Sequence, residues 1–176
     1  LMKDQVTALN QAGIHAAYLN SSLTPGQYQT ALRNMIQGRY RIVYVAPERL
    51  LTESFLRAVS QIMISMVSVD EAHCISQWGQ DFRPSYLKIP DFVELLPSRP
   101  VVSAFTATAT AEVREDILAI LNLKNPVSIT TGFDRKNLKF IVEQPVDKLA
   151  AALDYLSDHR EDCGIIYCLT RKTVEE

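Results

Sequence analysis

Short apolar runs and helical patterns alternate along the whole chain. Residues 41–45, 62–67 and 101–105 are rich in branched apolar side chains, which is typical of strands buried on both faces of a parallel sheet. Between these runs, apolar side chains recur at helical spacing. The alternation predicts an α/β fold, in which a parallel sheet is flanked by helices. The predicted strands are residues 14–19, 41–45, 62–67, 101–105, 127–131, 138–142 and 164–168, and the predicted helices are residues 1–12, 25–37, 89–96, 112–121 and 147–159, with a further helix ending near residue 59.

One helix boundary carries a specific signal. Thr24 stands before Pro25, and Gln27 follows three residues after the threonine. A capping hydroxyl, a proline in the first turn and a glutamine at the third helical position are the parts of a capping box. We therefore predict that a helix begins at Pro25 and ends before Gly38.

Two carboxylates follow the predicted strand 62–67. Asp70 and Glu71 come where this strand runs out, and ligands of open α/β sheets bind outside the carboxyl ends of the strands. An aspartate there can hold a Mg²⁺ ion that bridges nucleotide phosphates, and a glutamate beside it can orient or deprotonate a water. His73 can hydrogen-bond to a neighbouring loop. The alternative is that Asp70 and Glu71 only cap a helix.

The segment 76–86 has the make-up of a functional loop. It contains Trp78, the only tryptophan of the chain, together with Phe82 and Arg83. Aromatic faces stack on any nucleic-acid base for about 1–3 kcal/mol each, and arginine adds charge and stacking. The alternative is a hydrophobic anchor that holds the loop on the domain. Gly79 and Pro84 make the segment a poor core element, which favours the exposed loop.

Composition limits the classes of function. The chain has 176 residues, is 47% hydrophobic and carries a net charge of −2, so a uniformly basic nucleic-acid coat is excluded. Three cysteines without a CxxC motif predict free thiols in a reducing compartment, and no zinc site is expected because Cys163 and Cys168 would lie on opposite faces of a strand, packed in the core. No apolar run is long enough for a membrane span, and no signal peptide is visible, so we expect a cytoplasmic protein.

We expect two domains within the chain. Residues 1–131 form the first, residues 132–137 are a polar and basic linker, and residues 138–176 begin the second. Both ends of the sequence fall within helical patterns that lack caps or breakers. The expectation is therefore that the sequence is an internal piece of a longer protein.

Together these motifs resemble those of the RecQ-family DNA helicases of superfamily 2. Asp70-Glu71-Ala72-His73 is similar to the family's metal and water motif, and residues 74–84 resemble its aromatic-rich loop, the most specific signal in the chain. The resemblance covers the whole chain in the correct order. Residues 1–6 resemble motif Ia, residues 44–50 motif Ib, residues 103–110 motif III, residues 132–138 the junction between two RecA-like domains, and residues 164–171 motif IV.

The resemblance implies ATP and Mg²⁺ as cofactors. By this likeness, Asp70 would bind Mg²⁺ through water, Glu71 would position the hydrolytic water, and His73 would link the ATP site to motif III. For His73 the alternative is a structural histidine. Coupling of hydrolysis to domain movement would involve Gln80, Ser103, Thr106 and Thr108. The hydroxyls of Ser103, Thr106 and Thr108 could instead only cap a helix, as we expect of Thr110.

The resemblance also implies single-stranded and partly duplex DNA as the partner. Trp78, Phe82 and Arg83 would engage single-stranded DNA. The residues expected near the DNA backbone are Lys3, Pro47, Arg49 and, more weakly, Arg171. Lys3 and Arg49 could equally be solvated surface charges.

Two departures from the family pattern affect this expectation. Gln80 stands where the family usually has histidine, so this position cannot titrate, and Lys136 replaces a common proline in the linker. The sequence also contains no G-x-x-x-x-G-K-[ST] loop to hold phosphates, nor the late arginine motifs of the second domain. The chain alone is therefore expected to be inactive, with an exposed sheet edge that makes it marginally stable or self-associating.

The leading hypothesis is a piece of an ATP-dependent 3′–5′ DNA helicase of repair and recombination, cytoplasmic and associated with the bacterial nucleoid. A second hypothesis is a degenerate nucleic-acid-binding module without motor activity, suggested by the missing phosphate loop. A third is an RNA helicase, against which the Trp78 loop argues because RNA helicases of the superfamily generally lack it.

Overall fold

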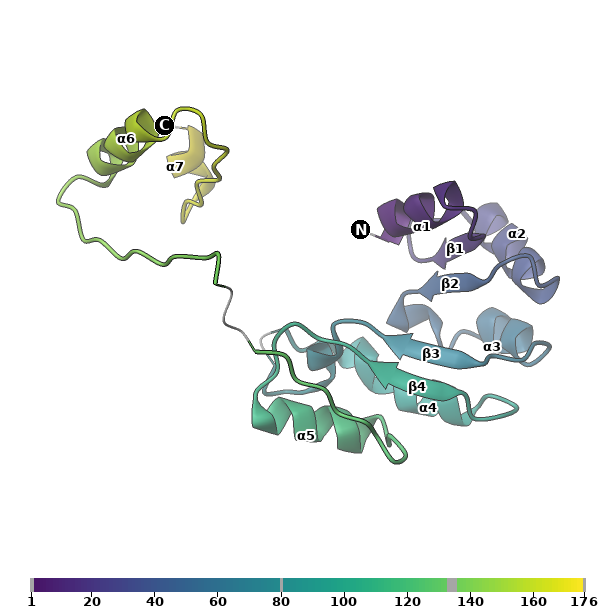
Figure 1. Ribbon diagram of the computed structural model, residues 1–176. Helices are drawn as coiled ribbons and strands as arrows, with labels where there is room; N and C mark the ends of the chain where they lie inside the picture. Colours follow the sequence, from purple (N-terminus) through teal and green to yellow (C-terminus); the bar gives the residue numbers. More distant parts are fainter. Residues whose placement is uncertain (1, 80, 133–135, 176) are drawn as a thin grey trace. The chain divides into compact units, whose positions relative to one another are not determined.

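The computed structural model describes residues 2–79, 81–132 and 136–175, and it divides the chain into two units (Figure 1). The first unit is Leu1–Ser128 and the second is Ile129–Glu176. Gln80 and three residues of the predicted linker, 133–135, lie outside the described residues. Each unit is considered by itself.

The first unit is built from parallel strand pairs flanked by helices, a RecA-like α/β arrangement, as predicted. Strand β1 pairs with β2 so that Ala16 lies opposite Ile42, and β3 pairs with β4 so that Met66 lies opposite Val101. Its elements are α1 (Met2–Gln11), β1 (Ala16–Leu19), α2 (Pro25–Ile36), β2 (Ile42–Val45), the 3₁₀ helix η1 (Pro47–Arg49), α3 (Glu53–Val59), β3 (Met66–Val69), the 3₁₀ helices η2 (Ala72–Ile75) and η3 (Pro84–Leu87), α4 (Lys88–Glu94), β4 (Val101–Ala104) and α5 (Ala111–Ile120).

One hydrophobic core joins these elements. Its buried side chains come mainly from β1 and β3, from the helices α2 to α5 and from η2. The rings of Phe55 in α3 and Phe92 in α4 meet with their centroids 5.6 Å apart, tilted by 31°. Ile75 of η2 is fully buried in the same cluster. The core therefore extends to the short turn that follows β3 and holds that turn in place.

The predicted start of α2 is confirmed in detail. The amide of Gln27 donates to the Thr24 hydroxyl at 3.3 Å, and the amide of Thr24 donates to the Gln27 side chain at 3.0 Å. Pro25 is the first helical residue, and Gly38, with φ of +68°, follows the helix in a left-handed conformation. Both glycine and proline therefore stand where their backbone preferences favour the observed ends.

The strand before the acidic turn is shifted from its predicted position. The sequence predicted residues 62–67, buried on both faces, whereas β3 covers Met66–Val69 and the side chain of Met66 is 51% exposed. In the described residues β3 pairs with β4 alone, so part of its surface has no neighbouring strand to cover it. The run 62–65 is apolar because Ile62 and Ile64 pack partly against the core, not because it is a strand.

Among its described residues, the second unit contains two helices, α6 (Lys148–Asp158) and α7 (Arg171–Glu175). The strands predicted at 127–131, 138–142 and 164–168 are wrong for the described residues, in which none of these segments pairs with another. Phe140 is 90% exposed and Tyr167 is 91% exposed. An isolated apolar segment has no partner for its backbone amides and carbonyls, so its composition alone does not make it a strand.

The cysteines of the second unit also differ from expectation. Cys163 is exposed and Cys168 is partly buried, so the prediction that both pack in a core is wrong. The only core that the described residues form lies in the first unit and contains neither of them. Among the helices that the structure describes, none has the length and apolar character to cross a membrane.

Substitution of the α2 cap should measurably destabilise the first unit. Thr24→Ala removes the acceptor for the Gln27 amide, and loss of an N-cap hydroxyl costs about 1 kcal/mol. We expect urea-induced unfolding, followed by circular dichroism, to show that decrease in the free energy of unfolding. Thr30→Ala, at an exposed position within the same helix, is the matched control and should leave stability unchanged or raise it slightly. Equal stability of the Thr24→Ala and wild-type chains would contradict the assignment of this cap.

Candidate functional site

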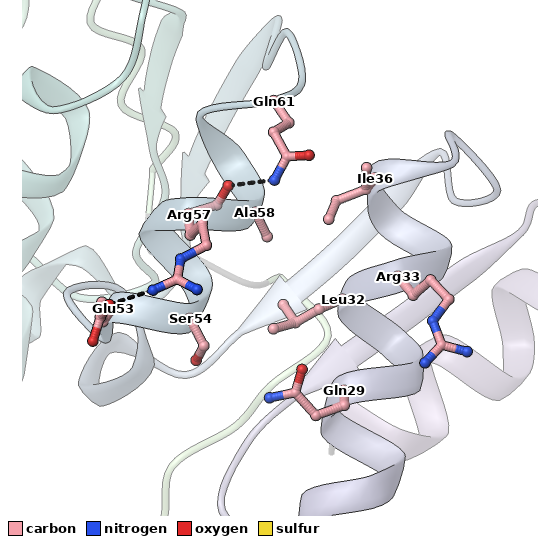
Figure 2. A pocket seen from close by; sticks show the side chains of 9 residues that line it. All are labelled: Gln29, Leu32, Arg33, Ile36, Glu53, Ser54, Arg57, Ala58 and Gln61. Carbon is pink, nitrogen blue, oxygen red and sulfur yellow. Dashed lines mark hydrogen bonds and ion pairs between the residues drawn. The ribbon is translucent and has the colours of Figure 1, made fainter.

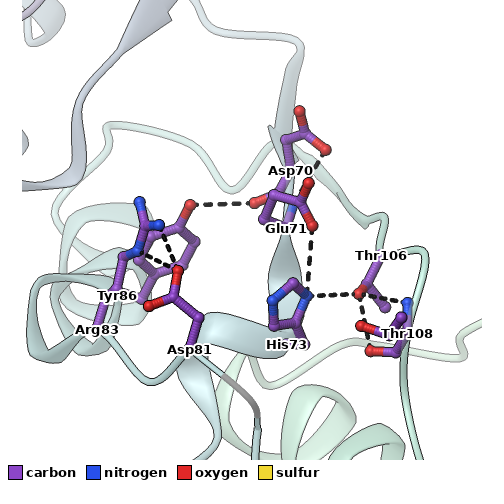
Figure 3. A network of polar contacts seen from close by, with 8 residues as sticks. All are labelled: Asp70, Glu71, His73, Asp81, Arg83, Tyr86, Thr106 and Thr108. Atoms are coloured by element: carbon purple, nitrogen blue, oxygen red, sulfur yellow. Dashed lines mark hydrogen bonds and ion pairs between the residues drawn. The ribbon is translucent and has the colours of Figure 1, made fainter. Parts of the chain in front are cut away.

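Backbone pairing brings the acidic turn beside the segment that follows β4. The amide of Phe105 donates to the carbonyl of Val69 at 2.8 Å, and the amide of Ala72 donates to the carbonyl of Phe105 at 2.9 Å. These two hydrogen bonds extend the β3–β4 pairing past the last strand residues. The side chains of Asp70, Glu71 and Thr106 therefore gather at the carboxyl ends of two adjacent strands (Figure 3), where ligands of α/β sheets bind.

The acidic turn has an unusual backbone at Glu71. Its φ of 48° and ψ of 44° place it in the left-handed region, which is unfavourable for a residue with a β-carbon. The Asp70 carboxylate accepts a hydrogen bond of 2.9 Å from the Glu71 amide. Glu71 occupies the N-cap position of η2 but makes no capping hydrogen bond with its side chain. The alternative that this glutamate serves only as a helix cap is therefore not supported.

His73 connects the acidic turn to the segment after β4. Its Nδ1 lies 2.8 Å from the Thr106 hydroxyl and 3.4 Å from a carboxylate oxygen of Glu71. The Thr106 hydroxyl donates to the Thr108 carbonyl at 3.1 Å and accepts from the Thr108 amide at 3.3 Å. A hydroxyl has a single proton to donate, which Thr106 gives to the Thr108 carbonyl, so Nδ1 of His73 is the donor in its contact with Thr106. The network joins a carboxylate, an imidazole and the loop of Thr106 and Thr108.

The aromatic loop leaves η2 through a fully buried serine. Ser76 is 0% exposed, and its hydroxyl donates to the Asp116 carboxylate of α5 at 2.6 Å while accepting from the Trp78 amide at 3.1 Å. Next along the chain, Gly79 lies so close to η2 that a β-carbon there would be 2.3 Å from the carbonyl oxygen of His73. Only glycine fits this position without a backbone shift.

The tip of the loop faces solvent. The Trp78 side chain is 80% exposed, so the alternative that it anchors the loop to the domain is wrong. Phe82 is partly buried. Arg83 is exposed and forms an ion pair with Asp81, and hydrogen bonding to this carboxylate raises the pKa of the guanidinium further above its ordinary value. The loop therefore presents an aromatic ring on a rigid base.

The loop returns to the acidic turn at its far end. The amide of Arg83 donates to the carbonyl of Cys74 at 2.9 Å, and the Tyr86 hydroxyl donates to the backbone carbonyl of Asp70 at 3.3 Å. Burial raises the pKa of Tyr86 and also that of the Cys74 thiol. Both groups are accordingly neutral near pH 7. The neutral Tyr86 hydroxyl thus links the loop to the backbone of the acidic turn.

The remaining predicted residues lie outside this network. Lys3 is exposed on α1, and Pro47 is the first residue of η1. The Arg49 guanidinium lies 5.2 Å from the centre of the Tyr28 ring, so it is not simply a solvated charge. Arg171 begins α7 in the second unit.

Ser103 lies within β4, and its buried hydroxyl has no hydrogen-bond partner among the described residues. Thr110 caps α5, as predicted, by accepting from the Val113 amide at 3.3 Å. The part of the chain that the structure describes contains no group of three or more His, Cys, Asp or Glu residues arranged to hold a metal ion. A Mg²⁺ ion carried by nucleotide phosphates does not require one, since a single carboxylate and waters can complete its shell.

A separate hollow lies between α2 and α3 (Figure 2). It has a volume of about 400 Å³ and contains none of the predicted site residues. Arg57 is engaged there with Glu53 in an ion pair. The lining residues are Gln29, Leu32, Arg33, Ile36, Glu53, Ser54, Arg57, Ala58 and Gln61.

Three residues of the site were not assigned a role from sequence. Ser76 and Asp116 are 40 positions apart, and nothing in local spacing indicates that they touch. Tyr86 was visible as an aromatic residue of the loop, but its bond to the Asp70 backbone depends on how the loop folds back. These contacts are tertiary and carry no signal in the sequence alone.

Comparison with known proteins identifies the family to which the chain is similar. Residues 1–117 match the family model described as DEAD/DEAH box helicase. The chain is 43% identical over 175 residues to the ATP-dependent DNA helicase RecQ of Bacillus subtilis, covering 99% of this chain and 30% of that protein. It is 40% identical to the RecQ of Haemophilus influenzae, covering 99% of this chain and 28% of that protein.

A more distant relative is the bifunctional 3′-5′ exonuclease/ATP-dependent helicase WRN of Mus musculus, 37% identical over 190 residues, which cover 100% of this chain and 13% of that protein. The chain thus spans less than a third of the length of these relatives. The matching model takes in the acidic turn, the aromatic loop and the Thr106 segment. The chain belongs to the DEAD/DEAH box helicase family, and within it to the RecQ helicases.

Proposed function

We propose that this chain is part of an ATP-dependent DNA helicase that couples ATP hydrolysis to translocation along single-stranded DNA. The observation that carries the proposal is the position of η2, which bears His73 on the side of the carboxylates and continues into the loop of Trp78. His73, which faces the proposed nucleotide site, therefore lies in the same short 3₁₀ helix from which the loop of the exposed Trp78 continues. RecQ relatives are named as ATP-dependent DNA helicases, which supports this assignment.

The donor set of the acidic turn fits Mg²⁺ and ATP. Both carboxylates are exposed at the ends of paired strands, and carboxylate oxygen is a ligand that Mg²⁺ prefers. Bound Mg²⁺–ATP would supply the phosphoanhydride bond and the charge neutralisation. Asp70 would hold the ion through water, and Glu71 would orient a water and take up its proton. His73, with a proton on Nδ1, would link Glu71 to the Thr106 loop.

On the DNA side, Trp78 would stack on bases without regard to sequence, as a translocating motor requires. Phe82 would add apolar surface, and Arg83, Lys3 and Arg49 would approach phosphates. Gln80 remains a predicted coupling residue. Pro47 and Arg171 remain predicted DNA contacts.

In the wider organisation, residues 1–131 would form the first RecA-like domain, residues 132–137 a linker and residues 138–176 the beginning of the second. Closure of two such domains around ATP would drive 3′–5′ unwinding in repair and recombination, in the cytoplasm. Ser103, Thr106 and Thr108 would transmit hydrolysis to this movement. The support is the family match together with the hydrogen bonds of the Thr106 loop.

A second candidate function is a nucleic-acid-binding module without motor activity. Its specific support is the exposed Trp78 ring, which can stack on bases whether or not ATP is hydrolysed. The two candidates differ in whether the protein turns over ATP.

Replacement of the proposed water-positioning residue should abolish ATP turnover. Glu71→Gln keeps the shape and hydrogen bonding of the side chain but removes its basicity. In the protein extended into the flanking coding sequence at both ends, we expect DNA-stimulated phosphate release to fall by roughly 10²- to 10⁴-fold. Glu94→Gln, at an exposed position at the end of α4, is the matched control and should behave as wild type. Turnover indifferent to Glu71, or none in the wild type, would favour the binding module.

Removal of the exposed tryptophan should weaken binding of single-stranded DNA. Trp78→Ala loses about 1–3 kcal/mol of stacking, so fluorescence anisotropy of a labelled oligonucleotide should report a dissociation constant roughly 5- to 150-fold higher. Trp78→Phe retains a stacking face and should recover most of the affinity. A matched RNA oligonucleotide tests the preference for DNA. Unchanged affinity of Trp78→Ala would remove this residue from the DNA site.

A further inference from the structure

The segment that runs from the Thr106 loop into α5 is held at two points, by His73 of η2 and by Ser76, the C-cap residue of η2. His73 contacts the Thr106 hydroxyl at the beginning of this segment, and Ser76 contacts the Asp116 carboxylate within the helix. Thr110 lies between these two points and caps the helix. The two contacts tie both ends of the segment to one 3₁₀ turn, so a displacement of the segment is transmitted to that turn.

The second of these contacts reaches the aromatic loop directly. The Ser76 hydroxyl has one proton, which it donates to Asp116, and it accepts the amide proton of Trp78. Ser76 is completely buried, so water does not compete for this hydroxyl. Close approach of Gly79 to the carbonyl of His73 leaves the base of the loop little room to move. The orientation of the Trp78 backbone therefore depends on the position of α5.

We propose that Ser76 and Asp116 are positioning residues that couple the Thr106 loop to Trp78, so that DNA stimulates ATP turnover through α5. The inference rests on the proposed helicase function and assigns to this pair a task distinct from holding ATP or DNA. The His73–Thr106 contact lies beside the proposed nucleotide site, and the Ser76–Asp116 contact lies beside the loop proposed to bind DNA. Neither Ser76 nor Asp116 is expected to touch either ligand.

The first test uses the chain itself. Trp78 is its only tryptophan, so intrinsic fluorescence reports on the loop alone. Ser76→Ala removes the acceptor of the Trp78 amide, and Asp116→Ala removes the acceptor of the Ser76 hydroxyl. In both variants the Trp78 ring should move more freely, so we expect a lower steady-state fluorescence anisotropy. Asp116→Asn keeps an oxygen acceptor for the Ser76 hydroxyl and should restore it. Thr24→Ala weakens the cap of α2, outside the segment 106–116, and serves as the control for general loss of stability.

The second test measures ATP turnover of the extended protein with and without single-stranded DNA. We expect Ser76→Ala and Asp116→Ala to retain basal turnover and to lose roughly 2- to 30-fold of the DNA stimulation. Asp116→Asn should recover the DNA stimulation, and Thr24→Ala should keep it.

Three outcomes would overturn the inference. Undiminished stimulation in both Ser76→Ala and Asp116→Ala overturns the inference alone and leaves the helicase proposal intact. An equal loss in Thr24→Ala would show that the effect is general destabilisation. No DNA-stimulated turnover in the wild type would overturn the proposed function and this inference with it. Circular dichroism of each variant confirms that a folded chain is being compared.

Discussion

The parallel pairing of β3 with β4 is the constraint on which the site depends. Val69 lies opposite Ala104, and the hydrogen bonds from Phe105 to Val69 and from Ala72 to Phe105 carry this register beyond the strands. Parallel strands end at the same edge of a sheet, so the residues that follow them meet. A shift of one residue would separate His73 from Thr106 and turn the side chains of the strand to the other face.

The turn after β3 combines an unfavourable backbone with complete burial of its base. Glu71 adopts a left-handed conformation, and the residues that follow it, Ala72, Cys74 and Ile75, are buried in or against the core. Such strain persists where surrounding packing holds it. The outcome is a rigid support from which an exposed tryptophan projects. The proposed motor needs both the firmly packed support and the exposed tryptophan, because a functional side chain is held precisely only when the element that carries it is rigid.

Much of the first unit could be predicted from local patterns. The capping box at Thr24, the strand predicted at residues 41–45 and found as β2 (Ile42–Val45), and the cap at Thr110 are all confirmed, because each depends on neighbours within a few positions. The strand predicted at 62–67 and those of the second unit were not, because strand formation requires a partner that a local pattern does not contain. Phe140 and Tyr167 have strand-forming character and remain exposed.

The same division holds for the site. The sequence by itself determined the candidate residues, the carboxylates Asp70 and Glu71 and the aromatic Trp78, because side-chain type and order along the chain are sufficient to single them out. Only the tertiary structure decided that Trp78 is exposed and that Ser76 bonds to Asp116, 40 positions away. Contacts between distant segments depend on how the strands pair and the helices pack, and short-range spacing does not encode those distances.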